Sequence, residues 1–139
     1  MDTSKPGPLL MVGGGVLMVL GSILDWGPNT SGLSMSAVGL LGLFVLVFGL
    51  IIGLIGATRA FGIAIELPAQ LVGFTQNQVA VVLGFTAFLW TFGTITRDNS
   101  ASGLHLTWIG AAVATAGAFI EHRGINIGTS TTTDGGDAA

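Results

Sequence analysis

The ionisable residues of this chain are few, and only two small groups of them have a spacing that chemistry could use. Asp25 stands at the end of the first apolar stretch, while Arg97 and His105 flank the start of the last one. A carboxylate, a guanidinium and an imidazole that meet on one side could hold a cation or pair with one another. We call Asp25, Arg97 and His105 the outer polar group. The alternative is a helix-end carboxylate beside Trp26, a residue expected at a membrane interface, with no binding role.

Glu121, His122 and Arg123 form the second group, at the end of the last apolar stretch. Cations there suit the negative end of a helix dipole, so anchoring is the simpler expectation. His105 and His122 fall at opposite ends of that stretch and cannot share a metal. Because cysteine is absent and no phosphate-binding loop or catalytic pair is present, we expect no cofactor, no metal site and no enzyme activity.

A modification signal and the overall charge complete the chemical inventory. Asn29-Thr30-Ser31 matches the acceptor triplet for N-glycosylation, which matters only in an organism with that machinery. The net charge is −3, whereas nucleic-acid binding requires a basic face that neutralises phosphates. Nucleic acid is therefore excluded as a partner.

Four apolar stretches must position these groups. Half of the 139 residues are hydrophobic and 8% are charged, whereas a soluble domain carries roughly a quarter charged residues. A helix crosses the hydrocarbon of a bilayer with about 20 apolar residues. Residues 8–26, 37–58, 79–95 and 104–120 approach or reach that length. The sequence predicts an all-α membrane protein, a bundle of four transmembrane helices.

The connecting segments indicate how the bundle lies in the cell membrane. Residues 59–78 form an inner connector whose apolar run, 61–74, is interrupted by Glu66 and Pro68 and is too short to cross. It lies at the interface, re-enters the bilayer, or packs beneath the bundle. Residues 127–139 are rich in Gly, Thr, Ser and Asp, which predicts a disordered tail.

The cations favour one orientation. Lys5, Arg59 and Arg123 fall on one side of such a bundle and Arg97 on the other. Because lysine and arginine are retained in cytoplasmic loops, we expect both termini to be cytoplasmic.

Small residues recur at helical spacing within the apolar stretches. Without a hydrophobic drive between helices in lipid, association depends on close van der Waals packing, which small residues permit. We predict helix packing at Gly42, Gly49, Gly53, Gly56, Gly84, Gly110 and Gly117. Packing within one bundle is the favoured interpretation, and a Gly49-x-x-x-Gly53 face for another subunit is the alternative.

Ser, Gly and Leu residues recur at matching spacing in the two halves of the chain, which suggests a tandem duplication of a two-helix hairpin. Ser31-Gly32-Leu33 precedes Gly39, and Ser102-Gly103-Leu104 precedes Gly110, with seven residues from glycine to glycine in both. Two copies of such a hairpin would point the same way across the membrane.

An apolar helix ending in Gly-Ser-x-Leu-x-Trp, a short polar turn and a glycine-rich second helix resemble the uncharacterised small four-helix membrane proteins of actinobacteria and archaea. The resemblance is best over residues 12–56 and transfers no site residues. We expect a non-catalytic subunit that packs in the lipid bilayer against larger integral membrane subunits or as a homo-oligomer. The alternative is a homo-oligomeric pore or solute carrier, including a viral membrane-permeabilising protein. Its outer mouth would hold Asp25, Thr91, Thr94 and Thr96, and the Glu66-Leu67-Pro68 connector would be its inner gate.

Overall fold

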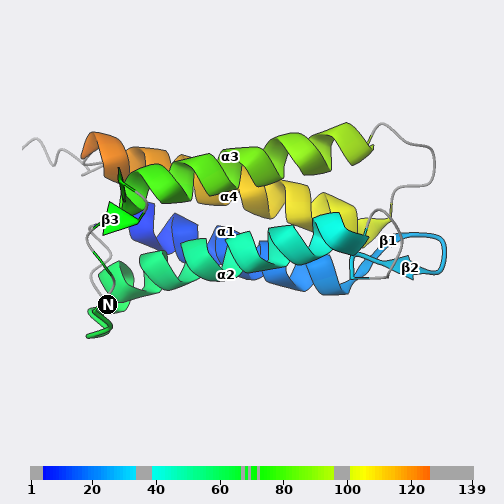
Figure 1. Ribbon diagram of the computed structural model, residues 1–139, viewed down its shortest axis with the longest axis horizontal. Helices are drawn as coiled ribbons and strands as arrows, with labels where there is room; N and C mark the ends of the chain where they lie inside the picture. Colours follow the sequence, from blue (N-terminus) through cyan, green and yellow to red (C-terminus); the bar gives the residue numbers. More distant parts are fainter. Residues whose placement is uncertain are drawn as a thin grey trace, which may run out of the picture.

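The four long helices expected from the sequence are present. The computed structural model describes residues 5–33, 39–66, 68, 70–71, 73–95 and 101–125. Its helices are α1 (Pro6–Ile23), α2 (Gly39–Phe61), α3 (Gln76–Ile95) and α4 (Ser102–Arg123) (Figure 1). All four are long and apolar enough to cross a membrane. The prediction of an all-helical, four-helix fold is confirmed.

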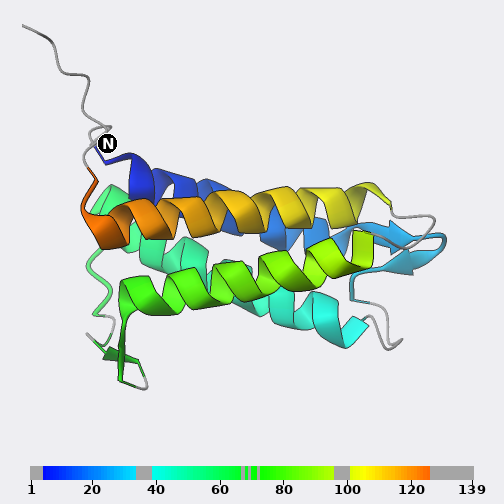
Figure 2. The same cartoon turned by 90° about the horizontal axis from the view of Figure 1, so that it is seen from above.

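Two short hairpins, which the sequence analysis did not predict, close the ends of the bundle. Strands β1 (Asp25–Gly27) and β2 (Thr30–Ser31) pair at one end, and β3 (Gln70–Leu71) and β4 (Phe74–Thr75) pair at the other (Figure 2). The turn of the first hairpin holds Asn29 at φ 58°, and that of the second holds Gly73 at φ 81°. Asparagine and glycine tolerate this left-handed backbone better than other residues do.

The helix bounds differ from the expected ones by two or three residues at one or both ends of every span. α1 ends at Ile23, so Asp25 and Trp26, which the predicted first span included, belong to β1. α2 continues past residue 58 to Phe61, and the described residues 61–66 that follow are exposed. The first part of the connector therefore does not pack beneath the bundle.

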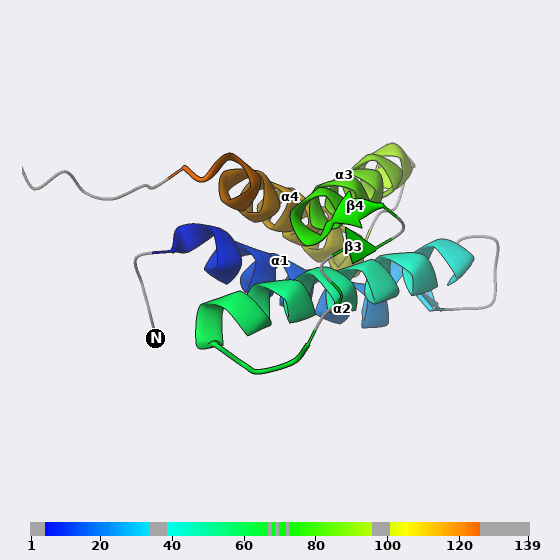
Figure 3. The same ribbon diagram turned by 60° about the vertical axis from the view of Figure 1, so that its left-hand side comes forward.

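The helices pack in the order α2, α1, α4, α3. The α1–α4 and α1–α2 contacts are extensive, α3 packs on α4, and α2 approaches α3 only loosely. Figure 3 shows the α3–α4 pair lying across the α1–α2 pair. The start of α1 and the end of α4 lie at the same end of the bundle (Figure 1), where Lys5 and Ile125 line one cavity. We call this the inner end and the end with β1 and β2 the outer end.

Candidate functional site

Six glycines hold α1 against α4. Each helix carries one at every seventh position: Gly7, Gly14 and Gly21 on α1, and Gly103, Gly110 and Gly117 on α4. We call these six residues the glycine seam. The two helices are antiparallel, so each glycine of the seam faces one glycine on the other helix: Gly7 faces Gly117, Gly14 faces Gly110 and Gly21 faces Gly103. A Cβ atom at Gly110 would lie 2.8 Å from the carbonyl oxygen of Gly14, and one at Gly117 would lie 2.7 Å from that of Gly7. The two backbones are therefore too close for any side chain.

The third pair of facing glycines, Gly21 and Gly103 at the outer end, is equally close, whichever of the two would carry the Cβ. A Cβ at Gly21 would collide with Thr107, and one at Gly103 would lie 2.9 Å from the Gly21 oxygen. In each glycine the hydrogen that replaces Cβ points at a facing carbonyl, the arrangement of Cα–H···O contacts between helices. A repeat of seven keeps such a seam aligned as two helices coil around each other. The sequence analysis identified Gly110 and Gly117 but missed the matching repeat on α1.

The predicted small residues of α2 face α1. A Cβ at Gly49 would lie 2.8 Å from the Met18 Cβ, and one at Gly56 would lie 2.8 Å from the Met11 Cβ. Gly53 is less tightly packed, with its nearest neighbour at 3.8 Å. Gly42 instead meets Gly32 of the outer hairpin. All four thus lie on the inward face of α2.

An apolar groove opens on the outside of this contact. It has a volume of about 490 Å³ and runs between Val12, Val16 and Leu20 of α1 and Leu50 and Leu54 of α2. The small residues Gly15, Gly49 and Gly53 also line it. We call it the α1–α2 groove. Gly49 and Gly53 therefore serve packing within the bundle and also border a surface open to the outside.

Aromatic rings flank α3 on both sides, while its buried face consists of the small residues Ala80, Gly84, Ala87 and Thr91. The Trp90 ring lies 6.0 Å from that of Phe48 and 6.2 Å from that of Phe44, both on α2. On the α4 side, Phe88 stacks on Trp108 at 5.8 Å. Only one predicted glycine, Gly84, makes a close approach here, to Thr115. Large rings therefore bridge the space between α2 and α3.

A second outward groove lies between α3 and α4. Its volume is about 430 Å³, its walls include Phe85, Phe88 and Phe119, and Ala112 and Ala116 are among the small residues that line it. We call it the α3–α4 groove. At its inner end the guanidinium carbon of Arg123 lies 5.4 Å from the centre of the Phe119 ring.

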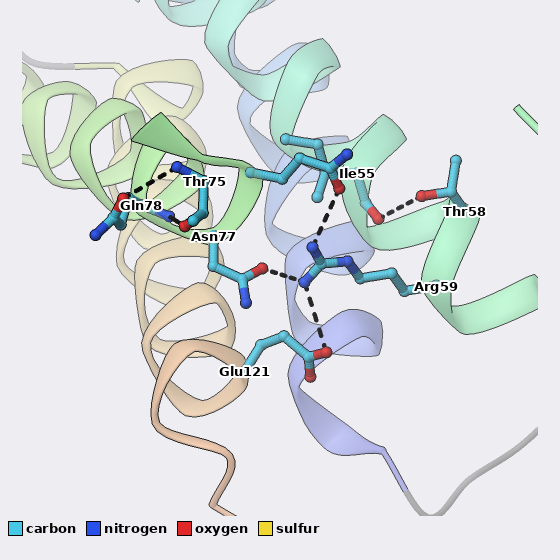
Figure 4. Close-up of polar contacts among 8 residues, drawn as sticks. Ile55, Thr58, Arg59, Thr75, Asn77, Gln78 and Glu121 are labelled. Carbon is cyan, nitrogen blue, oxygen red and sulfur yellow. Dashed lines mark hydrogen bonds and ion pairs between the residues drawn. The ribbon is translucent and has the colours of Figure 1, made fainter. Parts of the chain in front are cut away.

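Polar side chains from three helices meet at the inner end. Arg59 of α2 donates hydrogen bonds to Asn77 Oδ1 and, at 3.1 Å, to Gln76 Oε1, both on α3. It also lies 3.5 Å from Glu121 Oε1 of α4 (Figure 4). The Arg59 and Glu121 side chains are 27% and 28% exposed. We call Arg59, Gln76, Asn77 and Glu121 the inner polar cluster.

This cluster has a structural role that the sequence analysis did not identify. Its cation, carboxylate and amides bind one another and so join the inner ends of α2, α3 and α4. The predicted topology was the one feature of the sequence that could have indicated this contact, because it places Arg59 and Glu121 at helix ends on the same side of the bundle.

At the outer end, Trp26 is part of the core. It is 6% exposed, its Nε1 donates to the Gly21 carbonyl at 2.9 Å, and its carbonyl accepts from Ala101 N at 3.1 Å. The ring of Trp26 folds back over the end of the glycine seam and packs inside the protein, so its placement at a membrane interface stays a prediction. Its apolar body and single N–H suit such a buried site.

The outer polar group is placed only in part. Asp25 on β1 and His105 on α4 are exposed, and Arg97 lies outside the described residues. A Cβ at Gly103 would lie 2.7 Å from the Asp25 carbonyl, so β1 packs on the start of α4. Asn29 is exposed at the hairpin tip, and its glycosylation stays a prediction.

Buried hydroxyl groups are satisfied inside their own helices. Ser22, Thr91 and Thr107 are fully buried, and each donates to the carbonyl four residues earlier at 2.8 Å. Within the described ranges, no three His, Asp or Glu side chains gather in a way that could hold a metal ion. The three buried hydroxyl groups therefore leave no donor unpaired.

Comparison with protein-family models, with curated proteins and with solved structures found no match to this chain. The four apolar helices themselves are compatible with a multi-pass membrane protein.

Proposed function

We propose that this chain is a non-catalytic integral membrane subunit, inserted in the cell membrane with both termini cytoplasmic, that packs against larger membrane partners or against itself. The observation that best supports this role is the difference between the helix contacts inside the bundle and the apolar side chains on its surface. Inside, helices touch through backbone at the glycine seam. Outside, large apolar side chains such as Leu40, Leu50 and Val82 are more than half exposed, which suits contact with lipid or other apolar helices.

The distribution of charge supports the same role. Among the described residues, the ionisable side chains lie at the two ends of the helices and not at their centres. Pumps and proton-coupled carriers place such groups within their spans, where they mark ion and proton paths. A subunit that stabilises an assembly has no need of them.

The pore alternative receives less support from the residues that were its candidates. Thr91 is fully buried and its hydroxyl donates to the Ala87 carbonyl, so it does not line a path in a single copy. A conducting path would require several copies arranged around an axis.

The α1–α2 groove offers the sharpest test of partner packing. Gly53 has room for a Cβ and borders the groove, so Gly53→Leu should fill the groove and leave the bundle intact. Gly13→Leu is the matched control, since Gly13 is exposed on the same bundle with no neighbouring atom within 4 Å of its Cβ position.

The tagged full chain would be purified from its own membranes in mild detergent, and its companions quantified by mass spectrometry. We expect unrelated membrane subunits or further copies at a fixed ratio, lost in Gly53→Leu and kept in Gly13→Leu. A homogeneous ring that carries solute across liposomes would contradict the proposal and favour the pore. A monomer with identical elution in both variants would also contradict it.

A further inference from the structure

The two outward grooves differ at their inner ends. Of the two helices that form the α1–α2 groove, only α2 carries a cation, Arg59. Its guanidinium points to Gln76, Asn77 and Glu121 and not to the groove. The α3–α4 groove ends at Phe119, and the Arg123 guanidinium lies over that ring. One groove therefore meets a cation already occupied by the cluster, and the other meets an exposed cation held in place by an aromatic face.

Arg123 is well placed to receive an anion from outside the protein. Its side chain is exposed, and its guanidinium lies over the ring of Phe119, which has no negative charge to neutralise it. The nearby carboxylate of Glu121 points to Arg59 on another side of α4. An arginine fork matches the geometry of a phosphate group.

The distance from Arg123 to the far end of the groove matches one leaflet of a bilayer. From Arg123 to Ala112, the far small residue, α4 rises by about 16 Å at 1.5 Å per residue. Half the hydrocarbon thickness of a bilayer is about 15 Å. The Thr115 hydroxyl in the groove donates to the Ala111 carbonyl at 2.7 Å, so the groove presents an apolar lining to an occupant. This shape and chemistry suit a fatty acyl chain.

We propose that the α3–α4 groove binds an anionic phospholipid, with one acyl chain along Ala112 and Ala116 and the headgroup phosphate on Arg123. The inference rests on the proposed membrane location. It adds a headgroup preference that the membrane location alone does not require, and it assigns that preference to one groove and one cation.

Native mass spectrometry of the full chain with equal amounts of phosphatidylglycerol and phosphatidylcholine tests the assignment. We expect phosphatidylglycerol to be preferred, and Arg123→Gln to reduce that preference about fivefold, the effect of one arginine near an anionic surface. Ala116→Phe, at an exposed position that lines the groove, should reduce the binding of both lipids. Lys5→Gln is the matched control, because Lys5 lies at the same end but lines a separate cavity beside Glu121.

Each result separates this inference from the membrane location. An unchanged preference in Arg123→Gln, or an equal loss in Lys5→Gln, would overturn the assignment. Flotation of the wild-type chain with pure phosphatidylcholine vesicles, without any preference for the anionic lipid, would overturn the site and leave the membrane location standing. Failure to float with vesicles of either composition would contradict both.

Discussion

The α1–α4 and α2–α3 contacts are built from opposite kinds of residues, glycines in the first and large aromatic side chains in the second. Between α1 and α4, side chains are removed, and glycines bring one backbone onto the other. Between α2 and α3, large rings are added, and Phe44, Phe48 and Trp90 span a wider gap. The first contact depends on shape at fixed positions, whereas the second depends on area. We therefore expect the first to tolerate almost no substitution and the second to tolerate many.

The largest effect should follow from adding one methyl group to the glycine seam. A Cβ at Gly14 would lie 2.6 Å from the Gly110 oxygen and would also collide with Ala114. Because both obstacles are main-chain atoms that cannot rotate away, Gly14→Ala should destabilise the bundle by roughly 1–3 kcal/mol, as overpacking does. The free energy of unfolding can be measured by SDS titration in detergent micelles, followed by circular dichroism.

The adjacent residue gives the control for this substitution. Gly13 is exposed, and its Cβ position has no neighbour within 4 Å. Since alanine is a better helix former, Gly13→Ala should be neutral or stabilise the bundle by up to about 1 kcal/mol. Equal effects of the two substitutions would mean that α1 and α4 are not in backbone contact.

The seam also shows what a sequence can and cannot tell. Helix number and type followed from the length of the apolar stretches, because an uninterrupted apolar run of this length has few other structures. The seam was readable as a repeat of seven in two helices, but glycines at other spacings, such as Gly13 and Gly93, have open surroundings and look alike in the sequence. Which glycine faces which helix depends on tertiary packing.

The outer end and the inner polar cluster were harder to predict for a related reason. The Trp26 ring is placed by the turn into β1, a local backbone event that an apolar count does not register. Arg59 and Glu121 are 62 positions apart, and their meeting depends on the packing order of the helices. Long-range pairing of this kind is not contained in any local pattern.

A smaller effect is expected on the aromatic side. Phe48→Ala removes the ring that stacks on Trp90, and such aromatic pairs contribute about 0.5–1.5 kcal/mol. The lost ring should let α2 and α3 move apart without unfolding. Because the chain has no cysteine, spin labels can be attached at introduced cysteines, here at the exposed Leu50 and Leu89. Double electron–electron resonance should then show a broader distance distribution between them.

A label pair across the other contact tests whether the two regions respond separately. Val16 on α1 and Ile109 on α4 are also exposed. Their distance distribution should stay unchanged in Phe48→Ala, because the glycine seam does not involve that ring. Broadening of both pairs together would show that the bundle loosens as one unit, against the division drawn between the two contacts.

The smallest effect should come from the ion pair that links the two regions, because Arg59 and Glu121 are each more than a quarter exposed and solvent screens their attraction. A double-mutant cycle with Arg59→Met and Glu121→Gln should give a coupling energy of about 0.2–1 kcal/mol in the same SDS titration. A cycle with Arg123→Met in place of Arg59→Met is the control, since Arg123 lies over Phe119 and should couple to Glu121 weakly. A coupling energy well above that range would mean that the pair is desolvated and that the inner polar cluster, more than either helix contact, sets how the two halves of the bundle lie together.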